Sequence, residues 1–128
     1  MTTTYGGVSH FISDGITTAS PQRLLVMLYD RLLLDLDRAQ LAIARFDHNA
    51  AHEALVHAQD ILTALDCSLD LDVWPAAETL SDIYGFVSNL LVEANLRKDA
   101  TVVAQCRELI DPIRDAWYEA AGLDARAA

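Results

Sequence analysis

Histidines are the residues of this chain whose type and spacing come nearest to a metal site. His48 and His52 are four residues apart, so a helix would place both imidazoles on one face, and His57 follows on the next turns. A zinc or di-iron site would also need paired cysteines or Glu-x-x-His pairs, and the sequence has neither. We therefore interpret these histidines as part of a solvated face and expect no metal and no other cofactor.

The carboxylates and thiols do not suggest catalysis either. Asp30, Asp35 and Asp37 flank apolar positions, and we interpret them as solvated charges rather than as acid–base catalysts. The sequence contains no glycine-rich phosphate loop and no nucleophile elbow. Cys67 and Cys106 lack the spacing of a disulfide framework, which is typical of a protein from a reducing compartment. These features predict a binding protein and no enzyme.

Charge and composition restrict what this protein could bind. The 128 residues carry a net charge of -10, which would repel nucleic acid and anionic lipid headgroups. The chain is 52% hydrophobic with 5 glycines and 3 prolines, a composition that favours a compact helical protein. It starts with neither a basic nor an apolar segment and contains no apolar run long enough for a membrane span. We expect a cytosolic protein with no nucleic-acid partner and no membrane insertion.

Four amphipathic helices are predicted to hold these residues in place. The first starts at Ser20-Pro21 and runs to about residue 45, because serine can cap a helix and proline suits its first turn. Caps near Asp47 and at Asp99 begin the second and fourth helices, and Pro75 begins the third. We predict an all-α, mostly antiparallel four-helix bundle over residues 20–122, with an N-terminal arm or short extra helix at 1–19 and a C-terminal tail at 123–128.

The apolar residues of these helices exceed what one core needs. The expected core positions of the first helix are Leu25, Leu28, Tyr29, Leu32, Leu36, Ala39 and Ile43, and those of the fourth are Val102, Cys106, Leu109, Ile113, Ala116 and Ala120. Additional apolar residues recur every seven positions outside these faces. Together with two apolar residues of the arm, they are the candidate partner-binding residues: Tyr5, Ile16, Met27, Leu34, Leu41, Val103, Ile110 and Trp117.

Several short motifs resemble one known family. The segment Thr18-Ala19-Ser20-Pro21-Gln22-Arg23-Leu24-Leu25-Val26-Met27-Leu28-Tyr29-Asp30 resembles the opening of flagellin export chaperones, the FliS family. Three further motifs resemble later parts of that family in the same order: Ser68-Leu69-Asp70, Ala94-Asn95-Leu96-Arg97-Lys98-Asp99 and Asp115-Ala116-Trp117. The chain departs from the family at Arg31, where a glycine is usual, and at Trp74-Pro75.

The resemblance implies a function that agrees with the surplus apolar rows. Members of the family are cytosolic chaperones that bind the disordered C-terminal segment of flagellin, prevent its premature polymerisation and keep it competent for flagellar type III secretion. The flagellar export gate is a second implied partner. The N-terminal arm is expected to cover the client surface when no client is bound.

Other readings of the apolar rows stay open. A helical adaptor or chaperone for a different secreted client would have the same pattern, because amphipathicity says little about partner identity. A weak homodimer is a further alternative, since the same rows could pair with themselves.

Overall fold

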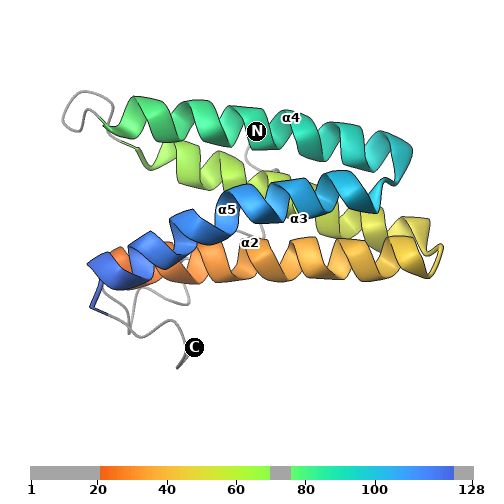
Figure 1. Cartoon of the computed structure of the whole chain (residues 1–128), viewed down its shortest axis with the longest axis horizontal. Helices are drawn as coiled ribbons and strands as arrows, with labels where there is room; N and C mark the ends of the chain where they lie inside the picture. Colours follow the sequence, from red (N-terminus) through yellow and green to blue (C-terminus); the bar gives the residue numbers. More distant parts are fainter. Residues whose placement is uncertain (1–20, 70–75, 123–128) are drawn as a thin grey trace, which may run out of the picture.

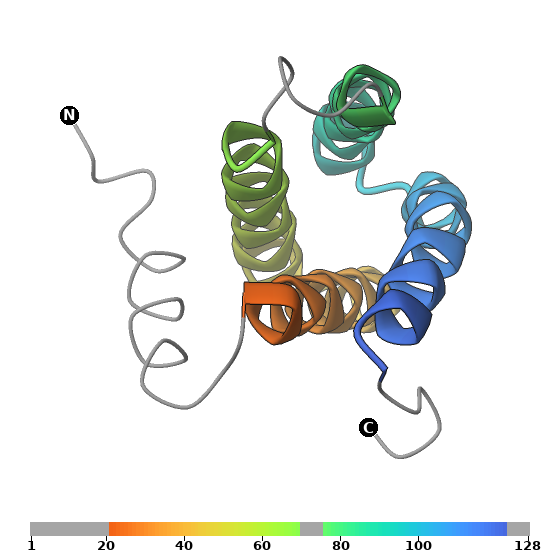
Figure 2. The same cartoon turned by 90° about the vertical axis from the view of Figure 1, so that its left-hand side faces the viewer.

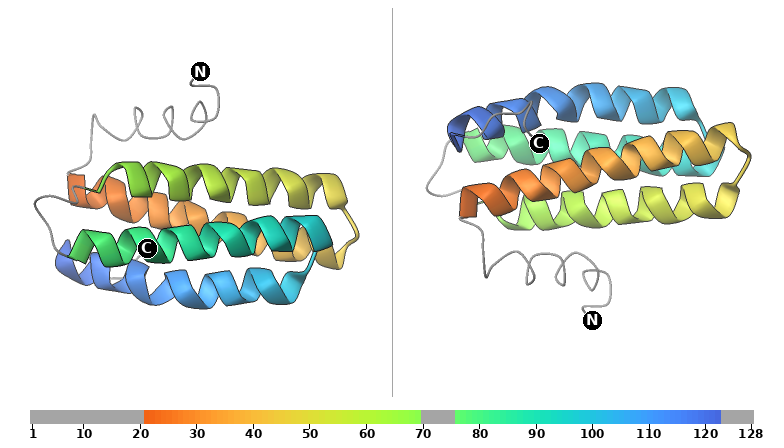
Figure 3. Two further views of the ribbon diagram at one scale, coloured as in Figure 1. Left: turned by 90° about the horizontal axis from the view of Figure 1, so that it is seen from above. Right: turned by 90° about the horizontal axis from the view of Figure 1, so that it is seen from below.

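Four α-helices form an up-down-up-down bundle in the computed structural model, which describes residues 21–69 and 76–122 (Figure 1). They are α2 (Pro21–Ala44), α3 (His48–Cys67), α4 (Ala76–Arg97) and α5 (Ala100–Ala120). Each helix packs against two others, so that α2, α3, α4 and α5 follow one another around a ring that α5 closes against α2 (Figures 2 and 3). The predicted all-α antiparallel bundle is confirmed for these residues.

Tight caps connect the helices at one end of the bundle. The Asp47 carboxylate accepts a hydrogen bond from the Ala50 amide at 3.1 Å, and the Asp99 carboxylate accepts one from the Thr101 amide at 2.9 Å. Both predicted N-caps are therefore confirmed. The residue before each cap, Phe46 (φ 58°) or Lys98 (φ 50°), has a left-handed backbone that ends the preceding helix, a position glycine usually occupies.

The core contains the predicted buried face of α2 together with apolar faces of α3 and α4. On α2, Leu32, Leu36 and Ala39 are fully buried, with Leu25 and Ile43 packed at the margins. The hydroxyl groups of Tyr29 on α2 and Tyr84 on α4 are hydrogen-bonded to each other across the core. This contact joins two helices that are not neighbours in the ring, and it satisfies both buried hydroxyls.

The prediction for α5 was wrong by a small rotation of the helix. Val103 and Ile110, expected on its outer shoulder, are 0% exposed and lie in the core. Leu109, expected inside, is 38% exposed, and Ala116 and Ala120 are also exposed. The predicted and the observed buried faces of α5 share Cys106 and Ile113. The observed face turns the large Trp117 side chain toward the core in place of an alanine.

Other expectations fall outside the described residues or remain without a test. Tyr5, Ile16, Ser20, the N-terminal arm, the Trp74-Pro75 segment and the C-terminal tail all lie outside 21–69 and 76–122. Pro112 lies inside α5, which continues through it to Ala120. In the described part of the chain, no helix combines the length and apolar character needed to cross a membrane.

Candidate interaction surfaces

An apolar groove opens between the beginning of α4 and the end of α5. It has a volume of about 550 Å³ and is lined by Ala76, Thr79, Leu80, Pro112, Ile113, Ala116, Trp117 and Ala120. Because α4 and α5 are antiparallel, the first turns of one helix lie beside the last turns of the other (Figure 1). Alanine side chains on both helices are too small to fill the space between them, so Leu80, Ile113 and Trp117 stay half-exposed. Thr79 is the one polar residue in this lining.

The candidate residues divide between this groove, the core and the outer face of α2. Trp117 lies in the groove. Leu34 and Leu41 are 41% and 51% exposed and form an outward row on α2 with the half-buried Met27. Val103 and Ile110 offer no surface to a partner, because the core covers both. The structure therefore does not bring the six candidates within residues 21–69 and 76–122 together into one site.

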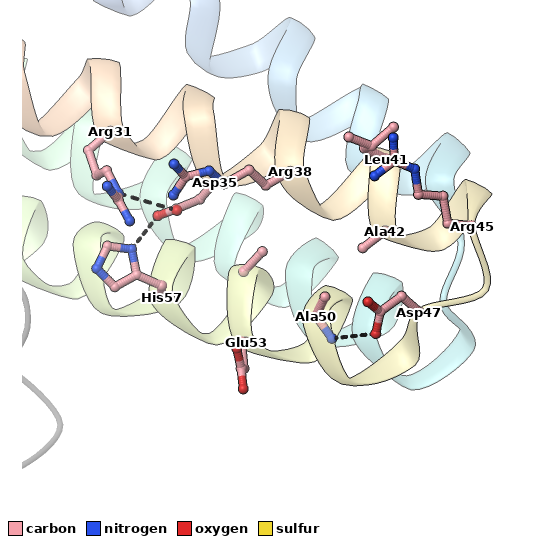
Figure 4. A pocket seen from close by; sticks show the side chains of 11 residues that line it. Arg31, Asp35, Arg38, Leu41, Ala42, Arg45, Asp47, Ala50, Glu53 and His57 are labelled. Atoms are coloured by element: carbon pink, nitrogen blue, oxygen red, sulfur yellow. Dashed lines mark hydrogen bonds and ion pairs between the residues drawn. The ribbon is translucent and has the colours of Figure 1, made fainter.

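A second groove, of about 500 Å³, lies between α2 and α3 near the other end of the bundle (Figure 4). Its walls combine charged and small side chains: Arg31, Asp35, Arg38, Leu41, Ala42, Arg45, Asp47, Ala50, Glu53, Ala54 and His57. Three arginines of this acidic chain line it.

Asp35 is buried beneath this second groove, and the expectation that it is solvated was wrong. Its side chain is 2% exposed and contacts His57 Nδ1 on α3 and, at 3.4 Å, Arg31 Nε on α2 (Figure 4). His57 is half-buried by the same contact and is not part of a solvated face. His52 does lie at the surface, where its Nδ1 is 2.9 Å from Asn95 Nδ2. Two of the histidines named above, His52 and His57, are therefore hydrogen-bonding partners of neighbouring helices.

The buried Asp35 should give folding stability a measurable pH dependence. Burial raises the pKa of Asp35 above its ordinary value of 3.8, although His57 and Arg31 oppose this shift. The folded state then holds the proton more tightly than the unfolded chain, so this residue destabilises the fold progressively as the pH rises from about 4 toward the raised pKa. We expect Asp35→Asn to remove that loss, so that the variant gains stability relative to the wild type across this range.

Urea unfolding at a series of pH values would measure the difference between the two proteins. His57→Gln is the companion variant, because it removes the partner that lowers the pKa of Asp35 and should make the decline steeper. A constant difference between wild type and Asp35→Asn from acid to neutral pH would contradict the assignment.

Two tyrosines and one cysteine in the core have structural roles. Burial raises the pKa of both Tyr29 and Tyr84, and it raises the pKa of the Cys106 thiol to about 12. These groups therefore stay protonated at neutral pH and cannot act as nucleophiles or bases there. Within residues 21–69 and 76–122, no three His, Cys, Asp or Glu side chains gather into a possible metal site.

A helical bundle with open grooves and core groups that stay protonated has the architecture typical of a binding protein. Comparison with known proteins identifies the family. Residues 8–124 match the family of the Flagellar protein FliS, and the chain belongs to that family. It is 33% identical over 110 residues to the flagellar secretion chaperone FliS of Salmonella typhimurium, covering 84% of this chain and 82% of the relative. Identity to the FliS of Bacillus subtilis is 30% over 107 residues, with 84% and 80% covered.

The family resemblance inferred from the sequence motifs is therefore confirmed, and the relatives are named as chaperones, which is a non-enzymatic class. Sequence analysis missed the α4–α5 groove because it placed Ala116 and Ala120 in the core. The alanines at 76, 116 and 120 were the available signal, since small residues on facing helices leave space between them.

Proposed function

We propose that this protein is a cytosolic export chaperone that binds the C-terminal segment of flagellin, keeps it from polymerising and delivers it for flagellar type III secretion. The apolar α4–α5 groove is the observation that carries the proposal, because it offers an open, uncharged surface of a kind that an amphipathic segment can cover. Membership of the secretion chaperone family supports the choice of client.

The proposed mechanism is exclusion of solvent and of other flagellin molecules. An apolar stripe of the client packs against Leu80, Ile113 and Trp117 and is then unavailable for filament contacts. Ordering a flexible segment costs part of the gross interaction energy, so the complex protects its client and still releases it. No nucleotide or catalytic step is needed.

The chain reaches α2 at the groove's end of the bundle, since Pro21 begins α2 where α5 ends (Figure 1). This position supports the proposal that the arm at residues 1–19, including Tyr5 and Ile16, covers the groove in the absence of client. Docking of the chaperone on the export gate remains a proposal of the same kind. A different secreted client is the alternative, and the groove itself does not distinguish the two.

Calorimetric titration with a C-terminal flagellin peptide from the same organism tests the function. We expect one-to-one binding with a large negative heat-capacity change, because the contact surface is apolar, and only weak dependence on salt. A scrambled peptide of the same composition is the control. Absence of binding, or a heat-capacity change near zero, would rule out this client in this groove.

A further inference from the structure

Charged residues recur every seven positions on both flanks of α2. Asp30 and Asp37 form the row that faces α5. Arg31 and Arg38 form the row beside α3, which Arg45 continues in the turn directly after α2. A spacing of seven keeps side chains on nearly one line along a helix, about 10.5 Å apart. Each row can therefore meet a second helix that carries opposite charges at the same interval.

The acidic row is already paired within the bundle. Arg114 Nε donates to Asp30 at 2.7 Å, and Arg107 Nε lies 3.2 Å from Asp37. Arg107 and Arg114 are themselves seven residues apart on α5, so the two rows form an antiparallel ladder. The Tyr118 hydroxyl also donates to Asp30, at 2.6 Å.

The basic row lacks such a complement on α3. Arg31 pairs with the buried Asp35, and Arg38 is close enough to lower the pKa of Asp35. The side chains of Arg38 and Arg45 make no hydrogen bond or close ion pair with any described residue. Of the acidic residues in this groove, Asp47 caps α3 and Asp35 is bonded to His57. Glu53 is exposed and forms no ion pair within the described residues.

Apolar side chains accompany the basic row. Leu34 and Leu41 are 41% and 51% exposed and repeat at the same interval of seven, and Leu41 lines the groove with Arg38 and Arg45. Leucine at one heptad position and a charged residue at a flanking position are the elements by which one helix recognises another. The face of α2 that no other described helix covers has this pattern from residue 31 to its end, and Arg45 continues it in the following turn.

We propose that the α2–α3 groove is a second docking surface, whose partner is an amphipathic helix with carboxylates one heptad apart. The carboxylates pair with Arg38 and Arg45, and the partner's apolar residues cover Leu34 and Leu41. Charge complementarity selects this partner, because a second copy of this chain would set its own arginine row against the same row.

This surface is separate from the proposed client groove. The α2–α3 and α4–α5 grooves are lined by different helix pairs and lie near opposite ends of the bundle. The two helix pairs face each other across the ring (Figure 2). The protein could therefore hold both partners at once, and the second surface does not depend on flagellin being the client.

The test uses a designed helical peptide of about 21 residues with leucine at one position and glutamate at a flanking position of each heptad. We expect it to bind the full-length protein in a strongly salt-dependent manner. Arg38→Glu should weaken binding about tenfold, and the double variant Arg38→Glu/Arg45→Glu about a hundredfold. A peptide with lysine in place of glutamate should bind the double variant and not the wild type.

Arg97→Glu is the matched control, because it makes the same charge change on an exposed residue at the end of α4 and should leave binding unaltered. Circular dichroism confirms that each variant is folded. Absence of peptide binding, equal weakening by Arg97→Glu, or no rescue by the lysine peptide would overturn the proposal. Competition by the flagellin peptide would also overturn it, because the α2 face would then belong to the client.

Discussion

Ala116→Asp is expected to weaken binding of the C-terminal flagellin peptide at least about a hundredfold, which corresponds to about 2.7 kcal/mol. The exposed Ala116 lies in the α4–α5 groove with Ile113 and Trp117, and a client that covers this groove would bury the new carboxylate against apolar atoms without a partner. Stability should fall by less than about 1 kcal/mol, because the change is on the surface and costs mainly helix propensity. Isothermal titration and urea unfolding measure the two quantities.

Gln105→Asp is the matched control for this experiment. It adds the same charge to the same helix at an exposed position outside the groove, and it should leave peptide affinity within about twofold of the wild type. Wild-type affinity of Ala116→Asp would place the client on a different surface and would refute the groove assignment.

Leu32→Ala should lower the free energy of unfolding by about 2–5 kcal/mol, the largest effect on stability that we expect. Leu32 is 0% exposed and packs in the core of the bundle, so truncation removes apolar contacts and leaves a cavity. Urea unfolding measures the change. Leu34→Ala, two residues away but 41% exposed, should cost less than about 1 kcal/mol. Similar losses for both variants would show that the two faces of α2 were assigned incorrectly.

The starts of α3 and α5 and the buried face of α2 could be predicted because they depend on local chemistry and on one helix at a time. Asp47 and Asp99 are recognisable as caps from residue type alone, and the bulky row through Leu32 and Leu36 has no rival of equal size on the same helix. On α5 two seams overlapped, and Ala116 instead of Trp117 was placed in the core. The rotation of α5 depends on which of its two apolar faces buries more apolar surface, and the periodicity of α5 alone does not give this buried area.

The interhelical polar contacts could not be derived from the sequence because they require the relative rotation and register of two helices. Asp35 and His57 are 22 residues apart, and the sequence contains no local feature that distinguishes this aspartate from Asp37, which is half-exposed. The ladder between α2 and α5 did have a sequence signal, since Asp30 and Asp37 match the spacing of Arg107 and Arg114. That signal has meaning only once α2 and α5 are known to be neighbours.

The interface between α2 and α5 also affects how the bundle assembles. Every other pair of packed helices is consecutive in the chain, whereas the Arg114–Asp30 contact joins residues 84 positions apart. Contacts between consecutive helices close small loops and can form early, whereas the α2–α5 interface closes the longest loop of the four and is therefore expected to form last. The helix that completes the ring, α5, is also one wall of the apolar groove. Folding intermediates that lack this final docking step would consequently contain α4 and α5 as a hairpin before α2 restrains them.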